Sequence, residues 1–304
     1  MARGAPHAGQ LALENSAARP SAWRMKFIFG LAVLLLSAGS ALGDVFTVAG
    51  REIHVPAPEG FVPVTEAMPQ VKRLTDRMAD PMNDTLAFYI STDIEPAARA
   101  GELPALGRYF ILKVNKKLRD HTMGAAEFSS VKSAIKQQNQ KIFEEIRSKI
   151  PGYMETIGQG VQKEFDVSFA MTISQMVPME PHWEVADAMA YSMFINYGMT
   201  VEGQSSSSVV AATSTFMNPA GSLLFLYAYG DKDELEWTRS ASATWANQIR
   251  ELNAPPPAKS AGGAGFDWSR FGGKVVVGAV IGALVGLVGG LVFRKKKADV
   301  QPRR

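Results

Sequence analysis

Cysteine is absent from this chain of 304 residues, and histidine occurs only four times. Without cysteine the protein can form neither a disulfide framework nor a thiolate metal site. The signatures H-E-x-x-H, G-x-S-x-G, G-x-x-x-x-G-K-[ST] and G-x-G-x-x-G are also missing, and these mark common metalloproteases, hydrolases and nucleotide-binding proteins. We therefore expect no catalytic residues and no cofactor, and an enzyme of unknown reaction is kept as an alternative.

An excess of positive charge is missing from the middle of the chain. The formal net charge is +3, but residues 1–43 carry +3 and residues 294–304 carry +5, which leaves −5 for residues 44–293. The net positive charge therefore lies in the segments that flank the two apolar runs, and the folded part between them is mildly acidic. Because a mildly acidic domain does not attract a phosphate backbone, the charge distribution argues against a nucleic-acid partner.

The first apolar run has the features of a secretory signal peptide. Met25 and Lys26 precede ten mostly apolar residues at 27–36, and small residues lead up to Gly43. Ten helical residues span about 15 Å, whereas the hydrocarbon core of a bilayer is ~30 Å thick. We therefore predict a signal region at 1–43 with cleavage before Asp44. The start of translation stays open between Met25 and an extended charged region that begins at residue 1.

The second apolar run is long enough to cross a membrane. Residues 275–293 carry no charge, and the cluster RKKK follows directly. Nineteen helical residues match the thickness of the hydrocarbon core, and a basic cluster stays on the cytoplasmic side. We predict a transmembrane helix at 274–293, a cytoplasmic tail at 294–304 and a single-pass protein of the bacterial inner membrane whose domain faces the periplasm. A eukaryotic secretory membrane is the alternative.

Glycine recurs at every fourth position of this predicted span. Such spacing places small residues along one side of a helix and lets another helix approach closely. Glycine is common in membrane helices in general, so the regular spacing is the informative feature. It predicts self-association or a partner membrane helix, through Gly278, Gly282, Gly286 and Gly290.

The region 44–253 is long enough to form its own hydrophobic core. Apolar residues alternate at strand spacing in several segments, and the strands follow one another as hairpins. We therefore predict an α+β domain with an antiparallel sheet packed by helices.

A hairpin turn is expected at residues 49–50, a type I turn at 218–221 and a mobile loop at 205–208. Residues 254–273, rich in Pro, Gly, Ala and Ser, predict a flexible linker. The predicted strands are 85–91, 108–114, 167–174, 185–199, 209–217 and 223–229.

Two segments have helical spacing instead. In 127–150 the apolar residues fall on one face, and Pro151 with Gly152 is expected to end the helix. In 231–252 the pair Asp231 and Glu234 resembles a capping box. The inward stripe of this second helix is predicted to be Trp237, Ala241, Trp245, Ile249 and Leu252.

Short motifs in the domain resemble a known family. Gly50, Ile53 and Pro56 form a G-x-x-I-x-x-P pattern, a PEGF loop follows at 58–61, and the region ends in a long hairpin and a helix that carries tryptophan. This order resembles the PsbP/DcrB-like α/β/α sandwich over residues 44–253. The resemblance implies the fold of the domain and carries over no catalytic residue.

One segment has a residue pattern typical of a metal site. Met176, Met179 and His182 recur at three-residue spacing, and thioether and imidazole ligands suit Cu(I) outside the cytoplasm. The prolines between them prevent a helix that would gather the three side chains, and methionine also fills hydrophobic cores. Core or loop packing is therefore the preferred interpretation, and a copper-handling protein is a lesser alternative.

The sequence thus favours a non-catalytic binding or assembly module of the cell envelope, anchored in the lipid bilayer and acting on an unidentified envelope protein. The enzyme alternative predicts a pocket that gathers His54, His121 or His182 with carboxylates.

Overall fold

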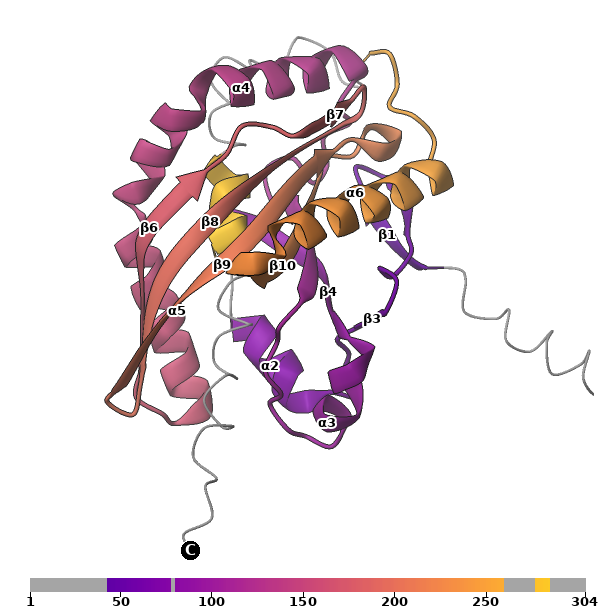
Figure 1. Cartoon of the computed structure of the whole chain (residues 1–304). Helices are drawn as coiled ribbons and strands as arrows, with labels where there is room; N and C mark the ends of the chain where they lie inside the picture. Colours follow the sequence, from indigo (N-terminus) through magenta and orange to yellow (C-terminus); the bar gives the residue numbers. More distant parts are fainter. Residues whose placement is uncertain (1–42, 78–79, 260–276, 285–304) are drawn as a thin grey trace, which may run out of the picture. The chain divides into compact units, whose positions relative to one another are not determined.

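The computed structural model describes residues 43–77, 80–259 and 277–284 of the chain. These residues form an eight-stranded antiparallel sheet with helices packed against it (Figure 1). The strands lie in the order β3, β4, β5, β10, β9, β8, β6, and β7 pairs with β8. The predicted α+β class is therefore confirmed. The strands are β3 (Phe61–Pro63), β4 (Asn83–Ser91), β5 (Tyr109–Asn115), β6 (Phe169–Pro178), β7 (Trp183–Val185), β8 (Ala188–Val201), β9 (Gln204–Met217) and β10 (Leu224–Asp231).

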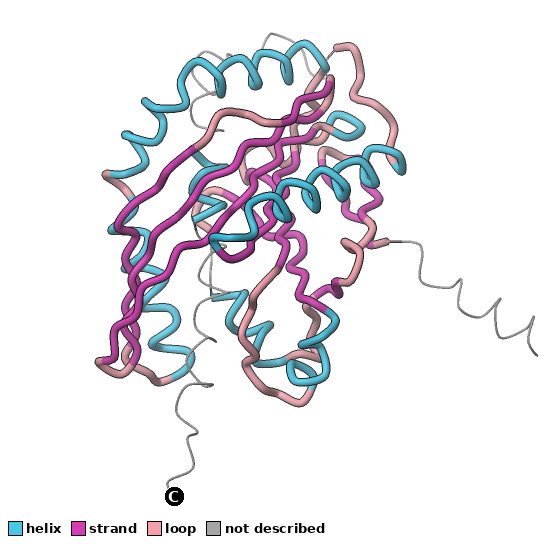
Figure 2. Tube along the Cα trace, viewed as in Figure 1, coloured by secondary structure: helices cyan, strands magenta, loops and turns pink. Residues whose placement is uncertain are grey.

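Helices lie on both faces of this sheet (Figure 2). On one face α6 (Leu235–Leu252) packs against β9 and β10. On the other face α4 (Ala125–Arg147) and α5 (Ile150–Phe165) share a large hydrophobic cluster with β8 and β10. The remaining helical elements are α2 (Pro69–Arg77), α3 (Glu95–Arg99), η1 (Thr92–Ile94), η2 (Pro219–Gly221) and η3 (Lys232–Glu234).

The alternation predicted for the longest strands is confirmed in β8. Its alternate large residues are all buried in the cluster beneath α4 and α5. In the first half of the strand the other alternate residues, Ala188, Ala190 and Ser192, are buried as well, on the face that carries α6, whereas Phe194 and Asn196 are half-buried. Both faces of the sheet are therefore covered in the first half of β8. The alternate residues are Met189, Tyr191, Met193, Ile195 and Tyr197.

The N-terminal hairpin forms a separate two-stranded sheet. β1 (Asp44–Val48) pairs with β2 (Arg51–Val55), and the turn between them is Ala49-Gly50 as predicted. Both turn residues have positive φ, 53° and 70°, which is the backbone conformation that matches the twist of a tight hairpin. Trp245 of α6 donates a hydrogen bond to the carbonyl of Pro56, 2.8 Å away, and so ties the chain beyond the hairpin to α6.

The prediction of a single helix at 127–150 was wrong at its C-terminal end. α4 ends at Arg147, and α5 begins at Ile150 with Pro151 in its first turn. Proline is tolerated there because the first backbone N–H groups of a helix have no intrahelical partner. Pro151 therefore lies at the start of α5 and does not mark the end of α4. The buried face of α5 is Ile150, Met154, Ile157, Gly158 and Val161.

Two loop predictions also need correction. Residues 205–208 were expected to be a mobile loop, yet they lie within β9 and pair with β8, from Ser205 opposite Thr200 to Ser208 opposite Tyr197. The hairpin at 218–221 is present, but its turn is not type I, because Ala220 has a φ of 50°. A type I turn needs a negative φ at that position.

The chain stays in contact with the domain beyond the predicted boundary at residue 253. The backbone N–H of Ala220 donates to the carbonyl of Ala254, and that of Ala125 donates to the carbonyl of Pro257. The predicted signal region before Gly43, the basic tail at 294–304 and the linker from residue 260 onward lie outside the described residues.

The packing of α6 leads to a first prediction. Trp245 is 1% exposed, contacts the rings of Tyr89 and Phe110, and makes the hydrogen bond to Pro56. Trp245→Phe should lower the free energy of unfolding by about 1–3 kcal/mol, because a hydrogen bond and part of the buried volume are lost. Chemical denaturation of the full chain measures this change.

A residue on the same helix provides the matched control. The predicted inward stripe was wrong at Leu252, which lies at the end of α6 and is 50% exposed. Leu252→Ala should therefore change the free energy of unfolding by less than about 0.5 kcal/mol. Equal losses for the two variants would contradict the assignment of Trp245 as the anchor of α6.

Candidate functional site

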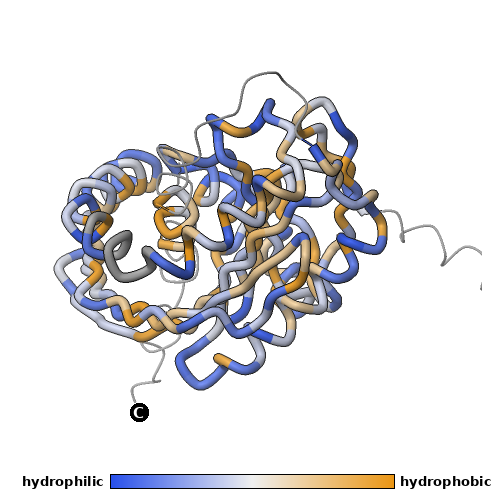
Figure 3. The backbone as a smooth tube through the Cα atoms, turned by 90° about the horizontal axis from the view of Figure 1, so that it is seen from above, coloured by the Kyte–Doolittle hydropathy of each residue, from blue (hydrophilic) through white to orange (hydrophobic). Residues whose placement is uncertain are grey.

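Part of the predicted membrane span lies inside the domain. Residues 277–284 form a helical segment whose side chains are all buried, in the cluster that also contains α4 and α5. In Figures 1 and 3 this apolar segment lies between the sheet and the helices of that face. The rest of the predicted span, 274–276 and 285–293, is outside the described residues. Among the residues described, no helix is long and apolar enough to cross a membrane.

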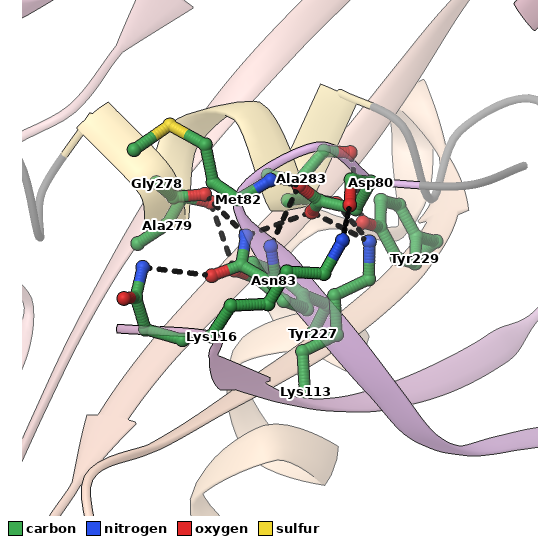
Figure 4. A network of polar contacts seen from close by, with 12 residues as sticks. Asp80, Met82, Asn83, Lys113, Lys116, Tyr227, Tyr229, Gly278, Ala279 and Ala283 are labelled. Carbon is green, nitrogen blue, oxygen red and sulfur yellow. Dashed lines mark hydrogen bonds and ion pairs between the residues drawn. The ribbon is translucent and has the colours of Figure 1, made fainter. Parts of the chain in front are cut away.

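The sheet binds the backbone of this segment through polar side chains. Within the described residues, four such side chains from β4, β5 and β10 donate hydrogen bonds to its carbonyl oxygens (Figure 4). We call these four residues the donor row. The bonds are Asn83 Nδ2 to Gly278 O at 2.8 Å, Tyr227 Oη to Ala279 O at 2.8 Å, Lys113 Nζ to Gly282 O at 3.1 Å, and Tyr229 Oη to Ala283 O at 2.8 Å.

The two described glycines of the repeat face the sheet. A Cβ atom on Gly278 would lie 2.9 Å from Asn115 Nδ2, and one on Gly282 would overlap Tyr227 Oη. The absence of side chains thus lets the helix backbone approach the donor row closely. Gly278 and Gly282 were predicted to contact another membrane helix, and here they contact polar side chains of the same domain. Gly286 and Gly290 lie outside the described residues.

A buried ion pair supports the donor row. Lys113 Nζ lies 3.1 Å from Asp80 Oδ2, and the two side chains are 2% and 0% exposed. Asp80 also accepts hydrogen bonds from the backbone N–H groups of Met82 and Asn83 and from Asn83 Nδ2. Burial of a charge is costly unless the charge is paired and hydrogen-bonded. The carboxylate of Asp80 meets this condition through these four contacts.

The side-chain amide of Asn83 is held in one orientation. Its Oδ1 accepts a hydrogen bond from Asn115 Nδ2 at 3.3 Å, while its Nδ2 donates to Asp80 and to Gly278 O. Both donor hydrogens of the amide are thereby used. Asn83 therefore connects the ion pair to the carbonyl of the bound segment.

Burial sets the protonation of the donor row. It raises the pKa of Tyr227 and of Tyr229 well above 10.0, so both hydroxyl groups keep the proton that they donate. Burial lowers the pKa of Lys113, and the nearby carboxylate of Asp80 opposes this effect. A buried lysine of lowered pKa can serve as a nucleophile, but Lys113 Nζ is engaged with Asp80 and Gly282 O. The arrangement is suited to holding a helix backbone.

Of the three residues of the metal hypothesis, Met179 and His182 both lie near Arg239, whereas Met176 lies apart from them. Met176 of β6 packs against the cluster beneath α4 and α5. Met179 Sδ accepts a hydrogen bond from Arg239, and His182 Nδ1 lies 3.5 Å from Ser192 Oγ, to which Arg239 also donates. A guanidinium at this place repels a metal cation. The described residues contain no group of three His, Asp or Glu side chains that could hold a metal ion.

The histidines of the enzyme hypothesis belong to different elements. His54 lies on β2, and its backbone N–H and carbonyl bond the side chain of Asn253. His121 precedes α4 and lies 3.4 Å from a carboxylate oxygen of Glu127. His182 lies between β6 and β7 next to Arg239, and burial together with this charge lowers its pKa. The three histidines thus have different partners, and for His54 it is the backbone that is bonded.

Sequence reasoning missed the donor row and Asp80. One signal was present: Lys113 interrupts the otherwise apolar run of β5, in which every residue is buried. A charge inside a fully buried strand requires a partner. Its partners, Asp80 and the segment at 277–284, are distant in sequence, so the pattern around Lys113 could not identify them.

No family model matches this chain, and no curated protein matches it.

The ion pair leads to a second prediction. Lys113→Met should lower the free energy of unfolding by about 3–5 kcal/mol, because it leaves the buried carboxylate of Asp80 without its cation. Asp80→Asn in the same chain should recover part of this loss, since the charge that lacks a partner is removed. Denaturant unfolding of the two variants measures both values.

An exposed ion pair provides the control for this prediction. Lys72 pairs with Asp76 on the surface of α2, where the Asp76 side chain is 56% exposed. Lys72→Met should cost less than about 1 kcal/mol. A similar cost for Lys72→Met and Lys113→Met would show that burial of the Asp80 pair does not matter.

The buried tyrosines lead to a third prediction. Burial raises the pKa of Tyr89, Tyr191, Tyr227 and Tyr229 in the folded protein. As the pH rises above 10, the unfolded chain loses protons that the folded protein keeps, so the stability from these groups is lost with rising pH. Lys113 acts in the opposite sense below 10.5, because its pKa is lowered in the folded state. The loss should therefore be clearest above that pH.

Tyrosinate absorbance and circular dichroism, followed together during alkaline titration, test this prediction. At least these four of the seven tyrosines should ionise only as the secondary structure is lost. Ionisation of all seven near pH 10 with unchanged circular dichroism would contradict it.

Proposed function

We propose that this chain is a non-catalytic binding or assembly module of the cell envelope, anchored by a single membrane span. In this proposal the domain faces the periplasm from the bacterial inner membrane, residues 254–273 tether it, and residues 274–293 form the anchor. The partner is an unidentified envelope protein. The helices on both faces of the sheet agree with the α/β/α arrangement implied by the PsbP/DcrB-like resemblance, which belongs to the same proposal.

The donor row is the observation that carries this proposal. Its four side chains hydrogen-bond the carbonyl oxygens of an apolar helix, and no side chain of that helix is polar in residues 277–284. These contacts hold a helix backbone, which supports a binding function. Apolar helices with small residues are the typical interaction segments of membrane proteins.

The length and flanks of the second apolar run support the anchor. The run 275–293 is uncharged and is followed by four basic residues, the pattern of a span whose C-terminal end stays in the cytoplasm. Residues 277–284 cannot contact the donor row and lipid at the same time. Anchoring therefore requires that this segment leaves the site.

Membrane extraction of the full chain, expressed with its signal region, provides a fourth prediction. The wild-type chain should remain in the membrane pellet after alkaline carbonate treatment, and the mature N-terminus should be Asp44. Leu287→Arg combined with Val288→Arg should release the chain, because each charge in the middle of a span costs about 2.5–3.5 kcal/mol.

Apolar replacements at the same two positions give the matched control. Leu287→Ile combined with Val288→Ile keeps the hydrophobicity and should leave the chain in the pellet. Release of the wild-type chain by carbonate would overturn the proposed anchor. A mature chain that still contains residues before Met25 would overturn the proposed signal peptide.

A further inference from the structure

We propose that the donor row and the surface around it form a receptor site for an apolar helix with glycine at every fourth position. Its occupant is the chain's own segment 277–284, which exchanges between this site and the bilayer. The inference rests on the proposed function, because exchange requires that residues 274–293 can serve as an anchor. Binding in the site would withhold the anchor from the membrane.

The spacing of the glycines fits the spacing of the donors. Asn83 and Lys113 reach the carbonyls of Gly278 and Gly282, one helical turn apart, and Tyr227 and Tyr229 reach the carbonyls that follow each glycine. Because i and i+4 positions lie on the same side of a helix, all four acceptors face the sheet together. The site therefore recognises carbonyl oxygens that repeat at one helical turn, and not particular side chains.

The site selects against larger residues at the glycine positions. A Cβ at Gly282 would overlap the hydroxyl of Tyr227, and a Cβ at Gly278 would crowd Asn115. A leucine-rich helix of equal hydrophobicity would therefore be held away from the donors, and the hydrogen bonds would lengthen or break. This selectivity distinguishes a receptor site from a general apolar surface.

The polar chemistry of the site also excludes lipid chains as occupants. The donor row presents an amide, an ammonium group and two hydroxyl groups in a place that is buried when the segment is bound. Hydrocarbon has no hydrogen-bond acceptors, so a lipid tail would leave these donors without partners at a high cost. The second lone pair of a helical carbonyl can accept such a bond.

The segment itself suits both environments. All eight residues at 277–284 are uncharged and apolar or glycine, and a helix satisfies its own backbone hydrogen bonds in lipid. In the domain the same segment fills the cluster beneath α4 and α5. The composition of the segment therefore favours neither the domain nor the bilayer strongly. The donor row adds hydrogen bonds to the backbone that lipid cannot make.

Site-specific photo-cross-linking of the full chain tests the exchange. The terminal methyl group of Met82 lies 3.5 Å from the place of a Cβ on Gly278, so a diazirine-bearing amino acid at position 82 would touch the bound segment and leave the glycines intact. Mass spectrometry identifies the cross-linked peptide. The chain is synthesised without membranes and then mixed with phosphatidylethanolamine and phosphatidylglycerol vesicles. The same photoreactive residue at Val45, which is 49% exposed on β1, reports non-specific reaction.

We expect strong intramolecular cross-linking to 277–284 without vesicles and a loss of at least threefold when vesicles are in excess. Tyr227→Phe combined with Tyr229→Phe should reduce the cross-link further, because two donors are removed and the rings remain. Tyr191→Phe on β8 is the matched control, since this buried tyrosine donates no hydrogen bond to the segment among the described residues, and it should leave the yield unchanged.

Three results would overturn the inference. The first is the absence of a cross-link without vesicles, and the second is a cross-link between two chains, which would make a second copy the occupant. The third is a cross-link that excess vesicles do not reduce. Carbonate extraction of the same vesicles then separates the two proposals. A chain that stays in the pellet retains the proposed anchor and refutes only the exchange, whereas a released chain refutes the proposed anchor as well.

Discussion

The buried ion pair between Lys113 and Asp80 is the constraint around which this side of the domain is organised. Both charges lie where a hydrophobic core would otherwise be continuous. Their burial is tolerable only because each remaining polar group finds a partner. Asp80 is satisfied within its own loop and by Asn83, whereas Lys113 requires one more acceptor, which is the carbonyl of Gly282. The buried charge of Lys113 on β5 therefore needs a hydrogen-bond acceptor, and the backbone of the helical segment provides it.

The sheet was predictable because its signal is local. The alternation of large and small residues in β8 and the helical spacing of α6 depend only on neighbours within a few residues. Both are confirmed, except that Leu252 at the end of the α6 stripe is exposed. The errors have equally local causes. Pro151 can end one helix or occupy the first turn of the next, and the sequence offers both. The serines of β9 lack the β-branched pattern of a strand, but they complete a ladder whose partner, β8, fixes their conformation.

The glycines of the site could be predicted from the sequence, but the side chains that contact them could not. The glycine repeat was recognised as a surface for close approach, and Gly278 and Gly282 do permit such an approach in the structure. The sequence predicts self-association or a partner membrane helix at these glycines. In the structure the sheet lies against them, and Asn83, which is 195 residues away in sequence, bonds the carbonyl of Gly278. Contacts of this range leave no periodic signal along the chain. Lys113 was the one local indication that the cluster needed a polar partner.

The same physical features make a helix suitable for a bilayer and for this site. Uncharged residues reduce the cost of leaving water, and glycine at every fourth position exposes the carbonyl oxygens to a neighbouring group. In a bilayer that neighbour is usually another helix, whereas here it is a row of side chains whose donors are fixed by the fold. An apolar run of this kind therefore does not specify its environment by itself. The partner decides where the run binds. Without the segment the donors of the domain would lack the carbonyl oxygens that they bond, whereas lipid has no such bonds to lose.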